Sequence, residues 1–445
     1  MNYLGLRLRP GRRRTATAVS VLLLPLTLSS LSACSDDDGT ATPPVASPPA
    51  TASGARCETA PLAADQGSGA APAPTGAYTL DSGERAAPDT EEFETARRDE
   101  SAVLVSGSGH LSTRDSHITK RGGTSSLDAS GRRGLNAAAL ARDGGRLDLS
   151  GGWFSTKGRG ATGVFASGEG TRATLSASAV RTKGSYAPAV RAADGGEAEL
   201  TYAEIETAGA QAPPVAAGPD GAKVAVYDST MTSAGCGSPG VQTAGDVSVT
   251  GTLFDLANSE AFTVEAGGSL SLRNVRATAA AGGVVLRGDG DTSFAMSGGS
   301  IQAADGDLFS VREAIADVRL SGGAELKTKG GKLLRVRDRG VVTLAADGEK
   351  LKGDVVVADG SASLELTGRT RLDGAVAGAS MTLGPRARWS VSGDSRLEGL
   401  DLGSGARLSK VIDGNGHSVT YDRSASPGLH GKTYRLTGGG TLRPA

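Results

Sequence analysis

A repeated unit of roughly 20–26 residues recurs along most of this chain and limits the possible folds more than any other feature. Each copy has a short apolar segment, a glycine-rich turn, a segment of alternating apolar and polar residues, and a short segment ending at another glycine. Copies begin, for example, at Gly163, Ala189, Val284 and Val355. Such a drifting but unbroken step is typical of a solenoid, whose insertions fall in its turns. The equivalent apolar positions are Ala139, Val164, Val190, Val215, Val241, Val264, Val285, Phe309, Leu334, Val356 and Val376.

Apolar and polar residues that alternate with a period of two predict strands with one face turned inward. A single unit cannot bury that face, but the next unit stacked on it covers the face and pairs its backbone. We therefore predict an all-β fold, a right-handed parallel β-helix of about 10–11 rungs between residues 101 and 378, closed by a C-terminal β cap. Leucine-rich repeats have a similar length, but their Leu-Asn ladder is absent, and propeller blades need about 40 residues or more.

Glycine contributes 66 of 445 residues, roughly twice its usual share. Many glycines follow aspartate at corresponding places in the units, as in Asp143-Gly144, Asp194-Gly195 and Asp359-Gly360. Glycine accepts a positive φ without a steric penalty, and aspartate bonds its own backbone in turns. These pairs therefore predict the tight turns between strands.

Residues 1–33 predict a lipoprotein signal peptide, with a basic start and an apolar segment that is too short and too interrupted to span a bilayer. The segment ends at Leu31-Ser32-Ala33-Cys34, which resembles the bacterial lipobox. The resemblance implies that Cys34 is lipidated and that acyl chains hold the exported protein on the outer face of a bacterial cell envelope. Arg12-Arg13-Arg14 leaves both the general and the twin-arginine export routes open.

Residues 34–75 are rich in Ala, Pro, Ser and Thr, have almost no large apolar side chains, and predict a disordered tether. Residues 76–100 are polar and mostly acidic and predict an N-terminal cap or linker. Residues 101–378 then form the predicted β-helix, and residues 379–445 its cap.

Cys57 and Cys236 remain after Cys34, and an exported protein resides where disulfides persist. A bridge between them and two free thiols are both open. The four histidines are scattered without metal-ligand spacing, so we expect neither a metal nor another cofactor.

Basic and acidic residues number 47 and 48, so no basic field would attract nucleic acid, and we do not expect that partner. The densest carboxylates are Asp289, Asp291, Asp305 and Asp307, whose glycine neighbours indicate turns. Hydrolases of the β-helix fold need carboxylates gathered on one face. We therefore do not expect an enzyme, although a carbohydrate-active β-helix protein is the alternative.

The segment from Trp389 to Gly405 resembles the C-terminal passenger segment of pertactin-like autotransporter adhesins. An aromatic residue leads a strand, a Gly-Asp-Ser turn follows, and a strand of spaced leucines comes next. The matching positions are Trp389, Val391, Gly393, Asp394, Ser395, Leu397, Leu400, Leu402 and Gly405. The resemblance implies a stabilising cap made by Trp389 and the three leucines. No amphipathic barrel strands follow, so it does not imply self-translocation.

The combined expectation is a monomeric, non-enzymatic, adhesin-like binding or display module on a bacterial surface, with a host surface or glycan as partner. Tyr202 and Tyr227 stand at comparable places in adjacent units and are the first candidates for a binding surface. A structural envelope component without a specific ligand is the remaining alternative.

Overall fold

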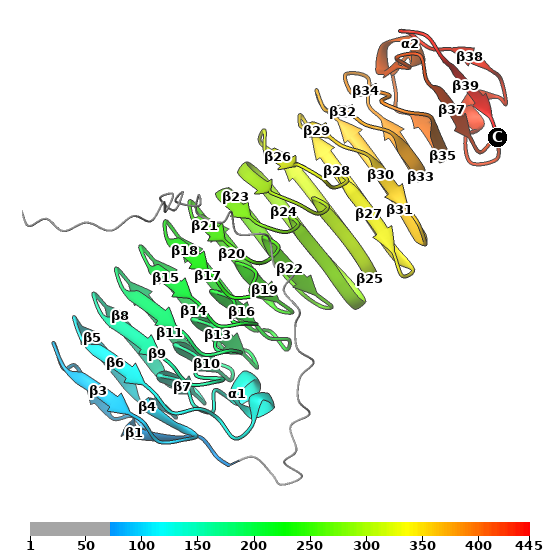
Figure 1. The fold of residues 1–445 in the computed structure, drawn as a ribbon. Helices are drawn as coiled ribbons and strands as arrows, with labels where there is room; N and C mark the ends of the chain where they lie inside the picture. The colour runs from blue at the N-terminus through cyan, green and yellow to red at the C-terminus, as the bar shows by residue number, and fades with distance from the viewer. Residues whose placement is uncertain (1–71) are drawn as a thin grey trace, which may run out of the picture. The chain divides into compact units, whose positions relative to one another are not determined.

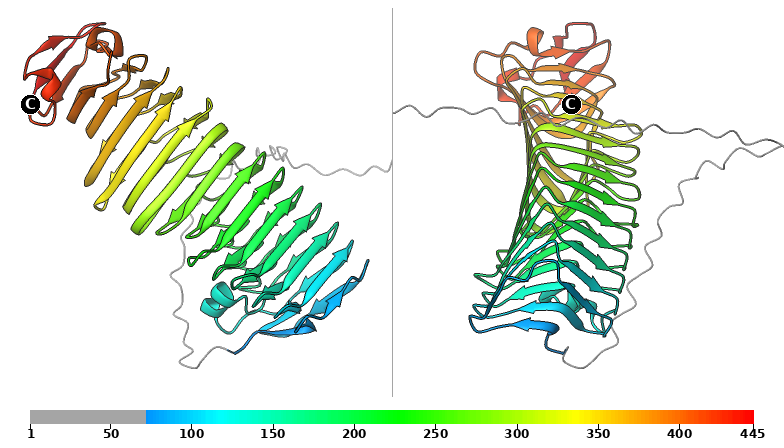
Figure 2. Two further views of the ribbon diagram at one scale, coloured as in Figure 1. Left: turned by 180° about the vertical axis from the view of Figure 1, so that it is seen from behind. Right: turned by 90° about the vertical axis from the view of Figure 1, so that its left-hand side faces the viewer.

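The computed structural model describes residues 72–445, where the chain forms a solenoid of about 15 mostly parallel β-coils. The predicted signal peptide, Cys34, Cys57 and most of the predicted tether lie outside the described residues. Figures 1 and 2 show the coils stacked on one another from three sides. The predicted all-β parallel β-helix is confirmed.

Strands occur in groups of three, and each pairs in parallel with the equivalent strand of the next turn. Thus β4 (Glu100–Val105) pairs with β7 (Ala139–Arg142), β5 (His110–Arg114) with β8 (Arg146–Ser150), and β6 (His117–Lys120) with β9 (Trp153–Thr156). We call the faces that contain β4, β5 and β6 sheet 1, sheet 2 and sheet 3.

The other strands extend these three sheets. Sheet 1 also contains β1 (Thr75–Leu80), β10 (Val164–Ser167), β13 (Val190–Ala193), β16 (Val215–Ala217), β19 (Val241–Thr243), β22 (Phe262–Glu265), β27 (Leu334–Arg337) and β30 (Val355–Val357). Sheet 2 also contains β2 (Arg85–Ala86), β11 (Arg172–Ser176), β14 (Glu197–Thr201), β17 (Lys223–Tyr227), β20 (Asp246–Thr250), β28 (Gly340–Asp347) and β31 (Gly360–Thr367). Sheet 3 also contains β3 (Glu92–Thr95), β12 (Ala179–Thr182), β15 (Glu204–Thr207), β18 (Thr230–Ser233), β21 (Leu253–Leu256) and β26 (Glu325–Thr328). On the same face, a separate four-stranded sheet follows, made of β29 (Lys350–Lys352), β32 (Arg371–Asp373), β34 (Arg388–Ser390) and β36 (Ile412–Asp413).

Five long strands bend from one sheet into another without a break. They are β23 (Ser269–Ala279), β24 (Val284–Ala303), β25 (Phe309–Ser321), β33 (Val376–Leu383) and β35 (Ser395–Leu402). In β24 the register with β25 shifts between Arg287 and Gly290, which marks the corner between sheets 1 and 2.

The predicted apolar column of sheet 1 is correct at most positions. Ala139, Val164, Val190, Val215 and Val241 pair in register from turn to turn. The prediction is wrong at three positions, where Phe262, Val284 and Val355 take the places expected for Val264, Val285 and Val356. Two apolar residues adjoin or alternate at each of these places, so the local pattern does not decide which one continues the column.

The solenoid also has more turns than the 10–11 expected, because it extends beyond residues 101–378. In the stretch predicted as a cap or linker, β1, β2 and β3 pair in parallel with β4, β5 and β6. The stacking also continues after β33 through β35 to β37 (Ser418–Tyr421) and β39 (Thr441–Pro444). The described solenoid therefore begins at β1.

Most buried apolar side chains form one continuous core inside the coils. A second, small cluster lies on the outer face of sheet 1, where α1 (Leu127–Arg133) and its flanking loop cover Phe165 and Leu140. The turns follow the predicted chemistry, since Asp194 and Gly195 both have positive φ, at 50° and 80°. Glycine adopts this region without strain and aspartate tolerates it.

The C-terminal end departs from the regular coils. After α2 (Leu408–Val411) and the short helix η1 (Pro427–Leu429), β38 (Tyr434–Arg435) pairs antiparallel with β39, the one antiparallel pair among the described strands. Trp389 is fully buried within β34 and pairs with Leu372 and Ile412 of the adjoining turns. Leu397 and Leu400 are also buried, and Leu402 is half-buried. None of the helices in residues 72–445 has the length and apolar character needed to cross a bilayer.

Candidate functional site: a groove along sheet 2

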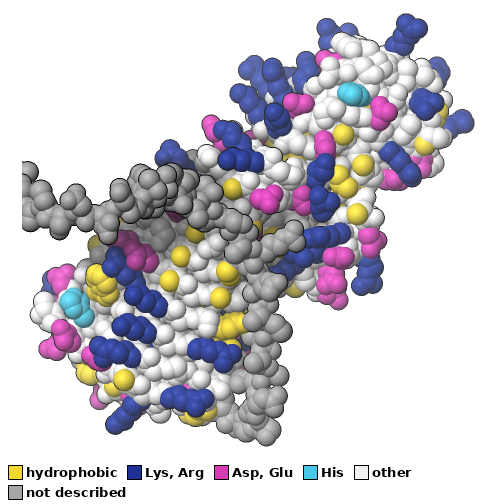
Figure 3. All heavy atoms as spheres, viewed as in Figure 1, with side chains coloured by type: hydrophobic (Ala, Val, Ile, Leu, Met, Phe, Trp, Pro, Cys, Tyr) yellow, Lys and Arg dark blue, Asp and Glu magenta, His cyan; other side chains and the backbone are white. Residues whose placement is uncertain are grey.

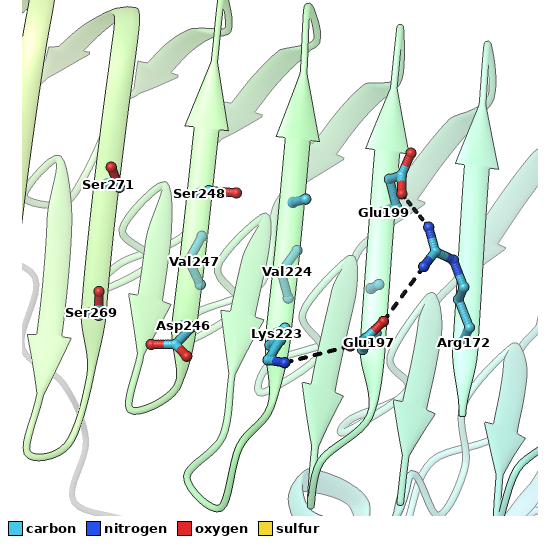
Figure 4. A pocket seen from close by; sticks show the side chains of 12 residues that line it. Arg172, Glu197, Glu199, Lys223, Val224, Asp246, Val247, Ser248, Ser269 and Ser271 are labelled. Atoms are coloured by element: carbon cyan, nitrogen blue, oxygen red, sulfur yellow. Dashed lines mark hydrogen bonds and ion pairs between the residues drawn. The ribbon is translucent and has the colours of Figure 1, made fainter. Parts of the chain in front are cut away.

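A groove of about 340 Å³ lies on the outer face of sheet 2. Strands alternate inward and outward residues, so each strand of β11, β14, β17, β20 and β23 presents every second side chain to this face. Figure 4 shows Arg172, Glu197 and Glu199 at one end of the groove, Lys223 in the middle, and Asp246 with the three serines toward the other end. The side chains that line it are Arg172, Glu197, Glu199, Lys223, Ala225, Asp246, Ser248, Ser269 and Ser271, with parts of Ala198, Val224 and Val247.

The charged end of the groove is a chain of ion pairs across three strands. A guanidinium nitrogen of Arg172 lies 2.5 Å from Glu199 Oε2, and the other lies 3.5 Å from Glu197 Oε2. Lys223 Nζ lies 3.7 Å from Glu197 Oε1. These groups are about half exposed, so each pair contributes only about 0–1 kcal/mol to stability. The ion pairs instead fix the positions of the charged groups, which stand at strand spacing along the groove.

Small side chains create the hollow itself. Ala225, Ser248 and Ser271 continue the register column of Glu199 from strand to strand. Their side chains are shorter than that of Glu199 and leave space above the sheet. A second hollow of about 770 Å³ shares Ser269 and continues over Ser293 and Thr343 to Glu365. The two hollows together form a shallow, hydroxyl-rich groove that follows the stacking direction from β11 to β31.

At the N-terminal side the same face holds a tightly bonded carboxylate, Asp148. It accepts hydrogen bonds from Arg146 Nε at 3.0 Å and Thr174 Oγ1 at 2.8 Å, and His110 Nε2 lies 2.7 Å away. Burial by itself would raise the pKa of Asp148, but the hydrogen bonds from Thr174, Arg146 and His110 outweigh it and lower the pKa. Asp148 is therefore held as an anion, an acceptor beside the groove.

The two tyrosines predicted as a binding surface are exposed, at 65% for Tyr202 and 39% for Tyr227. They are offset by one position, because Thr201 pairs with Tyr227, and the Tyr202 amide donates to the Tyr227 carbonyl oxygen at 3.1 Å. Tyr227 ends the strand that begins with Lys223 of the groove, so the tyrosines border the groove face at its far edge. Whether they bind a ligand stays a prediction.

The four aspartates considered as catalytic candidates lie at different corners. Asp289 and Asp291 stand at the register shift of β24, between sheets 1 and 2. Asp305 and Asp307 lie in the connection between β24 and β25, where the Asp305 side chain accepts from the Gly306 amide at 2.8 Å and Asp307 lies 2.6 Å from Arg335 Nε. Among residues 72–445, no cluster of His, Cys, Asp or Glu side chains could hold a metal ion.

Cys236 lies in the turn after β18 and is disulfide-bonded. A free thiol at Cys236, one of the two possibilities left open by the sequence, is therefore excluded, whereas pairing with Cys57 stays untested because Cys57 lies outside the described residues.

No model of a protein family matches this chain, and no curated protein matches it in sequence.

The groove residues were not singled out from the sequence. The sequence does contain a signal for these residues. A charged residue stands at the same outward position of three successive units, namely Arg172, Glu197 and Lys223. The recurrence shows that these side chains stack, but not that the following units carry small residues in the same column. That combination creates a groove.

Proposed function

We propose that this protein is a non-enzymatic, adhesin-like surface module that binds a linear glycan along the sheet 2 groove. The observation that carries the proposal is the groove itself, which repeats hydroxyl and charged groups at strand spacing over many turns. Solenoids offer extended binding surfaces of this kind, with many shallow contacts. The carboxylates of its charged end, Glu197 and Glu199, face cationic partners, an arrangement suited to hydrogen bonding with a polar chain.

The proposal includes the location of the module. The lipobox-like sequence that ends at Cys34 supports acylation there and display on the outer face of a bacterial envelope. The resemblance of residues 389–405 to pertactin-like passenger segments supports an adhesin-like role. A Cys34→Ala variant expressed in a bacterial host should move from the membrane fraction to the soluble fraction, whereas a variant that stays in the membrane contradicts the anchor.

Glycan binding is tested by filling the groove. Ala225→Trp places a large ring at its centre, and Thr230→Trp places the same ring on the next strand of the same turn, but on sheet 3. On an array of neutral and acidic oligosaccharides, we expect the wild type and Thr230→Trp to bind the same glycans. Ala225→Trp should bind at least about 10-fold more weakly, the loss expected when one central contact surface of an interface is removed.

Two results would oppose the proposal. If the wild-type array shows no binding, a glycan is not the partner. If a bound glycan is cleaved during incubation, as followed by mass spectrometry, the protein is a carbohydrate-active enzyme instead.

A further inference from the structure

Three arginines stand side by side at the corner where sheet 1 meets sheet 2. Arg287 of β24 pairs in register with Arg312 of β25, which pairs with Arg337 of β27. Neighbouring strands are about 4.8 Å apart, and like charges directly opposite each other on a sheet are destabilising. This arginine triad therefore places three guanidinium groups at strand spacing on one corner of the solenoid.

Within the triad, Arg312 is the member with a buried side-chain nitrogen that lacks a hydrogen bond among the described residues. That nitrogen is Nε, whereas Arg287 has Glu265 Oε1 at 2.8 Å. Burial lowers the pKa of Arg312, and its neighbours Arg337 and Arg287 lower the pKa further. Asp338 and Glu260 act in the opposite direction, but less strongly. An added negative charge would therefore be favourable beside Arg312.

Two members of the triad open onto a hollow of about 590 Å³, and Arg337 lies outside its lining. Arg287 and Arg312 line it together with Glu265, Glu313 and Asp338. Figure 3 shows Lys and Arg side chains, with Asp and Glu side chains beside them, over the part of the solenoid formed by β24, β25 and β27. This hollow is separate from the one in Figure 4 and lies across the corner from the second hollow of the groove.

Two exposed aliphatic side chains lie just beyond the triad. Ile315 pairs in register with Val341, and they are 57% and 41% exposed. Ile315 also lines the second hollow of the groove. A ligand that crosses this corner would therefore meet a cationic site and then an apolar ledge before it enters the groove.

We propose that the arginine triad binds the carboxylate or sulfate group of an acidic polysaccharide whose chain lies in the sheet 2 groove. This inference rests on the proposed function and names the class of glycan. Guanidinium groups bind such oxyanions with paired, charge-assisted hydrogen bonds. A single-stranded nucleic acid is less well matched, because it is held by aromatic side chains that stack on bases, and the exposed neighbours here are aliphatic.

The test measures binding of three probes to the purified full chain by isothermal titration calorimetry. The probes are a heparin octasaccharide, an octagalacturonate and a neutral maltooctaose. Arg312→Gln should weaken binding of at least one acidic probe at least about 10-fold, since loss of a charge-assisted contact commonly has this effect. Arg337→Gln should weaken it in the same direction, and thermal melting should show that both variants stay folded.

The matched control is Arg371→Gln. Arg371 also stands in register between two cations, Lys350 and Arg388, but in the four-stranded sheet that follows sheet 3, and it is exposed. Its loss should change the affinity less than about twofold, because a remote surface charge adds only screened attraction. An equal loss in Arg371→Gln would mean that the acidic probes sense general charge, and it would overturn the inference.

The remaining outcomes separate this inference from the proposed function. If Ala225→Trp abolishes binding of maltooctaose or of an acidic probe while Arg312→Gln and Arg337→Gln bind as the wild type does, the groove binds glycan and the triad does not. If a single-stranded DNA or a phosphatidylserine vesicle binds the triad more tightly than every oligosaccharide, the assigned ligand class is wrong. If no oligosaccharide binds at all, both proposals fall.

Discussion

The indole Nε1 of Trp389 donates a hydrogen bond of 2.9 Å to the main-chain carbonyl oxygen of Gly374, in the preceding turn of the solenoid. The indole thus joins two turns, and the ring itself is completely buried. Trp389→Ala would remove both the bond and the largest buried side chain of the C-terminal coils. We expect the free energy of unfolding to fall by about 3–5 kcal/mol, as measured by urea denaturation. A fall of less than about 1 kcal/mol would show that these turns do not depend on the ring.

Asp394, which follows Trp389 in the same turn, provides a contrast. Its Oδ1 accepts a hydrogen bond of 2.9 Å from the Ser418 amide, and the side chain is otherwise exposed. The amide oxygen of asparagine can accept the same bond. We therefore expect Asp394→Asn to change the free energy of unfolding by less than about 0.5 kcal/mol in the same urea experiment.

Gly184 is one of the turn positions that require glycine. A Cβ atom at this position would overlap the carbonyl oxygen of Gly158, one turn earlier. Gly184→Ala should therefore lower the free energy of unfolding by about 3 kcal/mol, because the backbones of the two turns must separate. Gly131→Ala in α1 is the control, since a Cβ there would have no atom within 4 Å, and alanine should raise helix stability by about 0.5–1 kcal/mol. Equal effects of the two substitutions would argue against close stacking as the cause.

Lys120 is completely buried in β6, and its ammonium group donates to the carbonyl oxygen of Arg97. Burial lowers the pKa of Lys120 from 10.5 to about 8, although Glu100 and Asp99 partly oppose the shift. Between these two pH values the unfolded chain binds a proton that the folded chain does not, so folding stability rises with pH. Measured against Lys120→Met, the wild type should gain up to roughly 3 kcal/mol from pH 8 to 10.5, since one pKa unit corresponds to about 1.4 kcal/mol. A constant difference between the two proteins across this range would contradict the prediction.

Glu349 is the acidic counterpart. It is fully buried, its Oε1 accepts from the Gly323 amide at 2.8 Å, and its Oε2 has no hydrogen-bond partner among the described residues. Burial raises the pKa of Glu349 above its ordinary value of 4.5, against the opposing effect of the backbone hydrogen bonds. The folded chain therefore holds a proton that the unfolded chain loses, and stability falls as pH rises above 4.5.

Glu349→Gln should remove this loss while keeping an oxygen for the Gly323 amide. We expect the variant to be about 1 kcal/mol more stable than the wild type at pH 7, within the range measured for buried charges replaced by neutral groups. The advantage should shrink toward pH 4.5 when thermal melting is followed across the range. A variant that is less stable than the wild type at pH 7 would show that the carboxylate is better compensated than its contacts indicate.

The sequence predicted the strands well because inward and outward alternation is a property of each strand alone. It predicted the wrong member of the column at Val285 and Val356, where two valines adjoin, because there the register with the preceding turn decides which valine faces inward. It also placed the start of the solenoid too late. Residues 76–100 are mostly polar, and a short strand such as β3 has only a few inward residues, among them Phe93, so its alternation is hard to recognise.

The groove and the arginine triad show what the sequence left open. Their side chains lie at outward positions, which the alternation of apolar and polar residues does reveal. The three arginines of the triad also stand at equivalent positions of successive units, at Arg287, Arg312 and Arg337. The recurrence does not reveal that Glu265 reaches Arg287 while Arg312 Nε has no hydrogen-bond partner among the described residues. Whether such ion pairs and hydrogen bonds form depends on the distances between side chains of different turns.

The sequence by itself determined the strands, the turns between them and the fact that successive units must stack, because backbone pairing and burial of one strand face follow from local patterns. The tertiary structure decided the register between turns, the position of Trp389 within the stack, and which charges meet on each face. The physical reason is that units of variable length come into register only through packing between turns, and the strength of a charge pair depends on that final separation.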